Sequence, residues 1–231
     1  MDDKIVSIII PIYNEKNFIL ETLRQVEDLA LPGLKKEIIL IDDGSQDGSR
    51  EILESLKDKY RIVIHEKNQG VGAAVRDGLK ASTGNYIVRQ DVDLEYAVSN
   101  IPQLLQPLIR GEADAVYGSR TLGKQGSYSK LYNFGSAAVN KLFNLLYFNR
   151  IYNFTTAAKA FKREIFDKIT LEEDRFETES EISAKIIRRG FKIVNVPIVH
   201  RSRTMEQGKK MRWYYTFKII AALFIYRFKK I

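Results

Sequence analysis

The first part of the chain alternates between short apolar runs and segments with helical spacing. Five runs rich in β-branched residues predict strands, at Val6–Ile10, Glu37–Ile41, Ile62–His65, Asn85–Arg89 and Ala113–Tyr117. Between them, apolar residues recur three and four positions apart and predict helices, at Lys16–Leu29, Ser49–Lys59, Gly72–Ala81 and Ser99–Arg110. Strands separated by helices of this length are typical of parallel sheets with right-handed crossovers. We therefore expect an α/β protein with a mostly parallel, Rossmann-like central sheet flanked by helices.

Carboxylates gather where two of the predicted strands end. Asp42 and Asp43 follow the second strand, and Asp91, Asp93 and Glu95 stand at alternate positions after the fourth. Side chains two positions apart in an extended segment point to the same face, so the last three would repel one another without a positive group between them. We interpret them as ligands of a divalent cation, Mg²⁺ or Mn²⁺, both of which suit oxygen ligands. An acidic turn facing solvent is the alternative.

Two other motifs near these strand ends are incomplete. The run from Asp43 to Glu54 resembles a calcium-binding loop, but it follows a strand where such a loop must follow a helix. The glycines Gly70 and Gly72 open like a dinucleotide-binding fingerprint, but Val75 stands where the third glycine belongs. We expect instead that these glycines let the backbone approach a ligand, with Arg76 one helical turn further on.

Composition narrows the class of protein. The chain has 231 residues, 45% of them hydrophobic and only five of them proline, which is enough for one large domain with a substantial core. It has no cysteine and two histidines, which excludes disulfides and thiolate metal sites and disfavours zinc chemistry. The first residues show neither the basic region nor the cleavage site of a signal peptide. We therefore expect a cytoplasmic protein.

The net charge of +8 comes from the C-terminal tail. Residues 201–231 hold nine Lys or Arg and one Glu, whereas the preceding residues carry 28 positive and 28 negative charges. The basic residues flank an apolar and aromatic run at 213–228, which as a helix would be about 24 Å long and too short for the roughly 30 Å hydrocarbon core. We expect a domain at 1–212 and a tail at 213–231 that lies as an amphipathic helix on an anionic membrane surface. The protein would then be peripheral to the cytoplasmic face of a membrane.

Other interpretations of the tail stay open. It could form a helix that packs on its own domain. Nucleic-acid binding is disfavoured, because the aromatic residues lie in an apolar run without polar groups that could read bases. The segment 139–147 also has the spacing of an amphipathic helix and offers either a second membrane contact or ordinary core packing.

The order of the motifs resembles a known family. The segments are VSIIIPIYNE, IILIDDGSQDGS, NQGVGAAVRDGL, QDVDLE, YGSR and RFETESEISAKIIRRG. They follow one another as in the family 2 glycosyltransferases of GT-A fold, and within these the dolichyl- or polyprenyl-phosphate sugar synthases. The resemblance covers residues 5 to 212. It implies the transfer of a sugar, mannose or glucose, from a nucleotide-diphosphate donor to a lipid phosphate, with inversion at the anomeric carbon.

The resemblance also implies roles for single residues. Asp93 and its neighbours would hold the cation against the leaving diphosphate, although Glu95 stands where Gln is common in relatives. Arg120 would clamp a phosphate, because a planar guanidinium can grip it in two places. Glu179 would lie near the acceptor, with capping of a helix as its alternative role. The residues expected at the nucleotide sugar are Pro11, Tyr13, Glu15, Asp42, Asp43, Gly70, Arg76, Asp91, Arg203, Lys209 and Lys210.

Some features leave the substrate and the activity open. The acceptor phosphate is largely ionised near neutral pH, so little or no general base is required. Asn153 stands where relatives usually carry Asp, and Ala157 and Ala158 replace a larger pair. The other hypotheses are a family 2 enzyme that acts on a polysaccharide or another soluble acceptor, and a catalytically silent nucleotide-sugar-binding protein.

Overall fold

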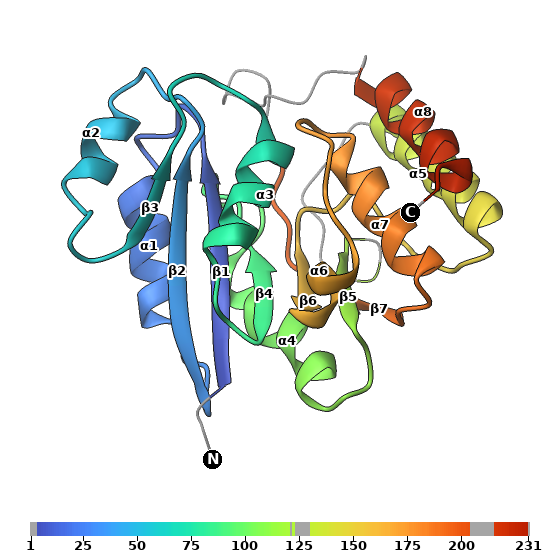
Figure 1. Ribbon diagram of the computed structural model, residues 1–231, viewed down its shortest axis with the longest axis horizontal. Helices are drawn as coiled ribbons and strands as arrows, with labels where there is room; N and C mark the ends of the chain where they lie inside the picture. Colours follow the sequence, from blue (N-terminus) through green and yellow to red (C-terminus); the bar gives the residue numbers. More distant parts are fainter. Residues whose placement is uncertain (1–3, 121, 123–129, 204–214, 231) are drawn as a thin grey trace.

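The computed structural model describes residues 4–120, 122, 130–203 and 215–230 (Figure 1). In this part of the chain, seven strands form one sheet in the order β3-β2-β1-β4-β6-β5-β7. The strands are β1 (Lys4–Ile12), β2 (Leu34–Asp42), β3 (Arg61–Ile64), β4 (Tyr86–Arg89), β5 (Ala115–Ser119), β6 (Lys159–Lys162) and β7 (Ile193–Pro197). The five strands expected from the sequence are all present, and β1 to β4 run parallel as expected.

The sheet also contains two strands, β6 and β7, that were not among the five predicted from local patterns. The four-residue strand β6 runs antiparallel between β4 and β5, and β7 then pairs in parallel with β5. The sheet is therefore mostly parallel with one antiparallel member.

Helices cover both faces of the sheet. They are α1 (Ile19–Asp28), α2 (Ser49–Glu54), α3 (Val71–Ala81), α4 (Ile101–Ile109), α5 (Lys130–Tyr147), α6 (Glu164–Lys168), α7 (Thr178–Arg188) and α8 (Tyr215–Phe228), with a 3₁₀ turn at Val98–Asn100. Successive residues of β1 enter different cores, because side chains alternate along a strand. Ile8 packs with residues of α1 and α4, whereas Ile9 packs with residues of α3, α7 and α8. Burial on both faces explains why the parallel strands are nearly continuous in apolar residues.

The C-terminal helix α8 packs on its own domain. It lies against α7 and α5 at one end of the molecule (Figure 1). Ile219, Leu223 and Tyr226 are buried, and the hydroxyl of Tyr147 in α5 donates to the carbonyl oxygen of Leu223 at 2.7 Å. This part of the α8 surface therefore packs on the domain, which is the alternative interpretation of the tail given above. Among the described helices, none combines the length and the apolar character that a membrane span requires.

The beginning of α3 is closed by another part of the chain. The carbonyl oxygen of Asp174 accepts hydrogen bonds from the backbone N–H groups of Gly72 and Ala73, at 2.7 and 3.1 Å. A Cβ atom on Gly70 would lie 2.4 Å from that same oxygen, and one on Gly72 would lie 2.3 Å from the carbonyl oxygen of Glu173. What approaches these glycines in the structure is the loop before α7, and the contact of Gly70 with a ligand stays a prediction.

This contact predicts opposite effects for two Gly→Ala substitutions in helices. Gly72→Ala should lower the free energy of unfolding by about 1–3 kcal/mol, because its methyl group meets backbone atoms that cannot turn away. The matched control is Gly135→Ala in α5, whose new Cβ atom has no neighbour within 4 Å among the described residues and which should stabilise by about 0.5–1 kcal/mol. Urea denaturation followed by circular dichroism measures both. Equal effects of the two substitutions would contradict the steric argument.

Candidate active site

A cleft of about 460 Å³ lies at the carboxyl ends of the parallel strands. Open parallel sheets bind ligands at this edge. Its walls come from the ends of β1, β4 and β5, the loops after β2 and β3, the loop before α7, and the first turns of α8. Eleven residues predicted from the sequence line it, namely Pro11, Tyr13, Glu15, Asp43, Gly70, Asp91, Asp93, Glu95, Arg120, Glu179 and Arg203.

Two predicted residues lie away from the cleft. Asp42 is fully buried, and its carboxylate accepts from the backbone N–H of Ser45 at 3.0 Å and from Nε of Arg50 at 2.8 Å. Arg76 points toward the loop before α7, where it pairs with the Asp174 carboxylate at 2.7 Å. Both side chains are therefore used inside the fold. Lys209 and Lys210 are outside the described residues.

In the structure, the positive group beside Asp93 and Glu95 is the side chain of Arg203. Both terminal nitrogens of Arg203 bond to the carboxylate of Glu15, at 3.0 and 2.9 Å, and Nη2 also lies 2.8 Å from Oδ2 of Asp93. The carboxylate of Glu95 accepts from the backbone N–H of Arg203 at 2.7 Å. The guanidinium thus bridges carboxylates from the ends of β1 and β4.

The surroundings of Asp93 disfavour the ionised form of its carboxyl group. Burial, reinforced by the negative charges of Asp91 and Glu95, raises the pKa of Asp93 from 3.8 to about 6, although Arg203 opposes the shift. A divalent cation would stabilise the ionised form of Asp93, and the all-oxygen donor set suits Mg²⁺ or Mn²⁺. Among the described residues, no three acidic or histidine side chains already converge on one point that could hold a metal. In the structure, Arg203 occupies Oδ2 of Asp93 instead.

A second charged network forms another part of the cleft wall. Arg89, at the end of β4, donates from Nε to Asp91 at 2.8 Å and from Nη1 to Glu179 at 2.6 Å. The other carboxylate oxygen of Glu179 accepts from Nζ of Lys159 in β6. Burial lowers the pKa of Lys159, and its ammonium also lies 4.7 Å from the centre of the Tyr117 ring. Glu179 therefore does more than favour the start of α7, since it joins two cations under the expected acceptor site.

Sequence reasoning missed both cations of this network. Arg89 could have been noticed in the sequence, because it is a charged residue at the end of an otherwise apolar strand. Lys159 gave no signal, because nothing local shows that the short run KAFK becomes a buried strand.

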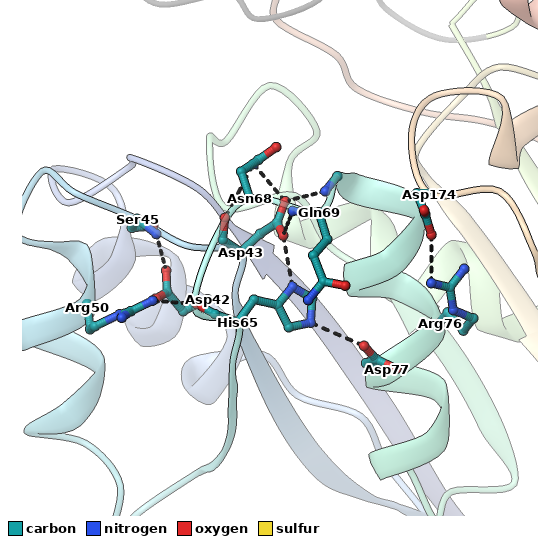
Figure 2. A network of polar contacts seen from close by, with 11 residues as sticks. Asp42, Asp43, Ser45, Arg50, His65, Asn68, Gln69, Arg76, Asp77 and Asp174 are labelled. Carbon is teal, nitrogen blue, oxygen red and sulfur yellow. Dashed lines mark hydrogen bonds and ion pairs between the residues drawn. The ribbon is translucent and has the colours of Figure 1, made fainter.

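The carboxylate of Asp43 organises the loop after β3 (Figure 2). It accepts from the backbone N–H groups of Gln69 and Gly70 at 2.8 and 2.9 Å, and from the side chains of Asn68 and His65 at 2.8 Å each. The second ring nitrogen of the buried His65 lies 3.2 Å from Asp77 in α3. Asp43 thus borders the cleft mainly as the residue that holds this loop against β2. The sequence did not single out His65.

Arg120 lies buried at the end of β5, beside the residue that departs from the family pattern. With the Asn153 amide oriented to satisfy its neighbours, its oxygen accepts from Nε and Nη2 of Arg120 at 2.8 and 3.1 Å, and its nitrogen donates to Thr155 at 3.2 Å. The amide of Asn153 thus holds the guanidinium of Arg120 in place. Thr155 and Ala157 line the cleft next to this contact.

The raised pKa of Asp93 predicts how its removal changes stability with pH. A native pKa of about 6 against 3.8 means that the folded protein binds this proton more tightly, so stability from this group is present below about pH 4 and is lost as the pH rises through 6. Asp93→Asn should therefore be more stable than wild type by up to about 3 kcal/mol above pH 6, and equal to it near pH 4. Urea unfolding in EDTA at several pH values measures the difference. A difference that does not change with pH would contradict the assignment.

Comparisons with known proteins agree with this geometry. Residues 7–170 match the family described as Glycosyl transferase family 2. A dolichol-phosphate mannosyltransferase of Pyrococcus furiosus is 30% identical over 211 residues, which are 88% of this chain and 58% of that protein. Glycosyltransferase AglJ of Haloferax volcanii is 29% identical over 200 residues, which are 86% of this chain and 63% of that protein. The chain thus spans less than two thirds of the length of these two relatives.

A solved structure shares the fold. Glucosyl-3-phosphoglycerate synthase from Mycobacterium tuberculosis, solved with Mn²⁺, uridine diphosphate and glucosyl-3-phosphoglycerate, superimposes with a TM-score of 0.72 at 20% identity, over 97% of this chain and 80% of that chain. The GT-A fold and the family expected from the motifs are therefore confirmed. The chain belongs to the family 2 glycosyltransferases.

Proposed function

We propose that this glycosyltransferase moves a sugar from a nucleotide-diphosphate donor to a polyprenyl or dolichyl phosphate at a membrane surface, with the help of Mg²⁺ or Mn²⁺. The observation that carries the proposal is the composition of the cleft. One side of it holds the acidic cluster of Asp91, Asp93 and Glu95, and its wall continues into Tyr215 and Ile219 of α8. A phosphorylated lipid needs a polar reaction centre next to an apolar path.

The donor would bind at the ends of β1 and β4. Pro11, Tyr13 and Glu15 border this side of the cleft. Asp91, Asp93 and Glu95 would hold the cation, which when bound supplies positive charge for the departing diphosphate. Arg203, once released from Asp93, would be available for the diphosphate as a guanidinium that can bind two oxygens. The structural neighbour contains Mn²⁺ and uridine diphosphate, which supports a metal of this kind.

The acceptor would bind between β5, β6 and α7. An oxygen of its ionised phosphate attacks the anomeric carbon, and the bond from that carbon to the diphosphate oxygen breaks with inversion. Arg120 would hold the attacking phosphate. Glu179 is fixed by Arg89 and Lys159 under this part of the cleft, so that a change at Glu179 also reaches Asp91 through Arg89. No proton needs to be removed from the acceptor.

Exposed apolar side chains on α8 and directly after α5 support membrane contact. Phe148 is 84% exposed and Phe228 is 79% exposed. The guanidinium of Arg227 lies 5.9 Å from the ring centres of both Tyr147 and Phe148, so the end of α8 and the end of α5 form one surface. Phe217 and Phe224 extend this surface along α8. Aromatic residues mixed with basic ones are typical of peripheral membrane helices. On this proposal the chain is peripheral to the cytoplasmic face of a membrane, and residues 213–231 are part of its anchor.

One observation favours a second candidate function. A family 2 enzyme with a soluble acceptor would have its tail packed on the domain, and Ile219, Leu223 and Tyr226 of α8 are buried in this way. The acceptor assay below distinguishes the two candidates.

We expect transfer only when donor, polyprenyl phosphate and divalent ion are all present. The assay follows nucleotide release from UDP- and GDP-linked mannose and glucose, with and without polyprenyl phosphate and Mn²⁺. Asp93→Asn should reduce transfer by about 100-fold or more, because it removes a ligand that acts on developing charge, while circular dichroism shows an unchanged fold. A variant that retains near wild-type turnover would remove the metal from the mechanism. Transfer to soluble acceptors alone would favour the second candidate.

The exposed surface predicts vesicle binding that point variants can reduce. Deleting α8 would also expose buried core residues, so Phe148→Ser with Phe228→Ser is the sharper change. We expect this double variant to bind vesicles with anionic lipid at least tenfold more weakly, because two exposed aromatic rings no longer enter the interface. Leu20→Ser is the control, since Leu20 is 60% exposed on α1, away from α5 and α8. Vesicle sedimentation measures binding, and equal binding of wild type and double variant would contradict the anchor.

A further inference from the structure

The loop before α7, residues 172–175, is held rigidly between two helices. The carboxylate of Glu181 in α7 accepts from the backbone N–H groups of Glu172 and Glu173 at 2.8 and 2.9 Å. On the other side, the carbonyl oxygen of Asp174 binds the start of α3, and Arg76 of α3 pairs with the Asp174 carboxylate, as Figure 2 shows. Arg76 also donates to the carbonyl oxygen of Glu172 at 3.2 Å. The backbone that carries the next residue, Arg175, is therefore fixed.

Arg175 lines the cleft without a partner for its charge. Its Cγ atom packs against Gly70, where an added Cβ would lie 2.8 Å away. Among the described residues, its guanidinium makes no ion pair or hydrogen bond, whereas Arg89 and Arg203 of the same cleft are each paired with two carboxylates or more. A solvent-accessible cation on a fixed backbone, in a cleft, is suited to bind an anion.

The neighbours of Arg175 indicate which anion this is. Phe176 follows it and contacts Tyr215 of α8 edge to face, with ring centres 4.8 Å apart. Phe176, Tyr215 and Ile219 line the same cleft. Arg175 thus shares the cleft with aromatic and apolar side chains, which matches a phosphate attached to a hydrocarbon chain.

We propose that Arg175 binds the phosphate of the acceptor and helps to select phosphorylated acceptors. The inference rests on the proposed function for the nature of the acceptor. Arg175 has no role among the sequence predictions, because an arginine just before a predicted helix is usually solvated. The donor diphosphate is the other phosphate that enters this cleft, and the experiment separates the two.

Equilibrium binding provides the test. Isothermal titration calorimetry would measure binding of farnesyl phosphate to the protein saturated with Mg²⁺ and its preferred nucleoside diphosphate, and in a separate titration the affinity for that nucleotide. The variants are Arg175→Gln, Arg175→Lys and, as a control, Arg189→Gln, which removes the same charge from the exposed end of α7. Loss of one charged hydrogen-bonding contact should weaken farnesyl phosphate binding by about 10- to 100-fold. Arg175→Lys should recover part of the loss, and Arg189→Gln should stay within about twofold of wild type.

Each result decides the inference. Weaker farnesyl phosphate binding with unchanged nucleotide affinity supports it. Unchanged farnesyl phosphate binding in Arg175→Gln, or no binding by wild type, overturns it, and so does an equal loss of nucleotide affinity, which would assign Arg175 to the donor. The proposed function is judged separately by the transfer assay. Transfer to polyprenyl phosphate that is insensitive to Arg175 would leave the function standing and remove only this residue.

Discussion

The compensation of negative charge at the carboxyl edge of the sheet is the constraint on which the site depends. Six carboxylates line one cleft, those of Glu15, Asp43, Asp91, Asp93, Glu95 and Glu179. Burying an ionised carboxylate without a partner costs several kcal/mol, so the fold has to bring cations to the same place. Arg203 and Arg89 do so, and Asp43 is satisfied by hydrogen bonds instead. On the proposed mechanism, a divalent ion replaces Arg203 at Asp93, so a single positive charge is exchanged for a double one and the carboxylates stay compensated.

Close backbone contacts determine the shape of the cleft. Gly44 lies so near the loop after β3 that an added Cβ would be 2.4 Å from the backbone nitrogen of Asn68. Gly70 and Gly72 make the corresponding approach to the loop before α7. Two walls of the cleft therefore rest on glycines, and a methyl group at either contact would move the wall. The contact of Gly70 and Gly72 with the loop before α7 also positions Arg175 in the cleft. The packing of α3 against that loop therefore contributes both to the stability of the fold and to the geometry of the site.

The C-terminal helix combines two roles in one segment. Ile219 and Leu223 pack into the core shared with α7, whereas Phe217 and Phe228 are exposed. Its first turn also reaches the cleft through Tyr215. Because α8 has apolar residues both in the cleft and on the outer surface, we propose that the lipid acceptor approaches along this helix.

The sequence by itself determined the order of the strands and helices in the first part of the chain and the residues that stand at strand ends. Apolar periodicity is local, so Val6–Ile10 and Gly72–Ala81 reveal their conformation without their partners. Only the tertiary structure decided the contacts of those residues. Arg203 meets Glu15 across 188 residues, Arg89 meets Glu179 across 90, and the strand β6 inserts between β4 and β5. Such pairs depend on strand order and on loop packing, which no local pattern encodes, and for that reason the cation beside Asp93 could be expected from the charges while its identity could not.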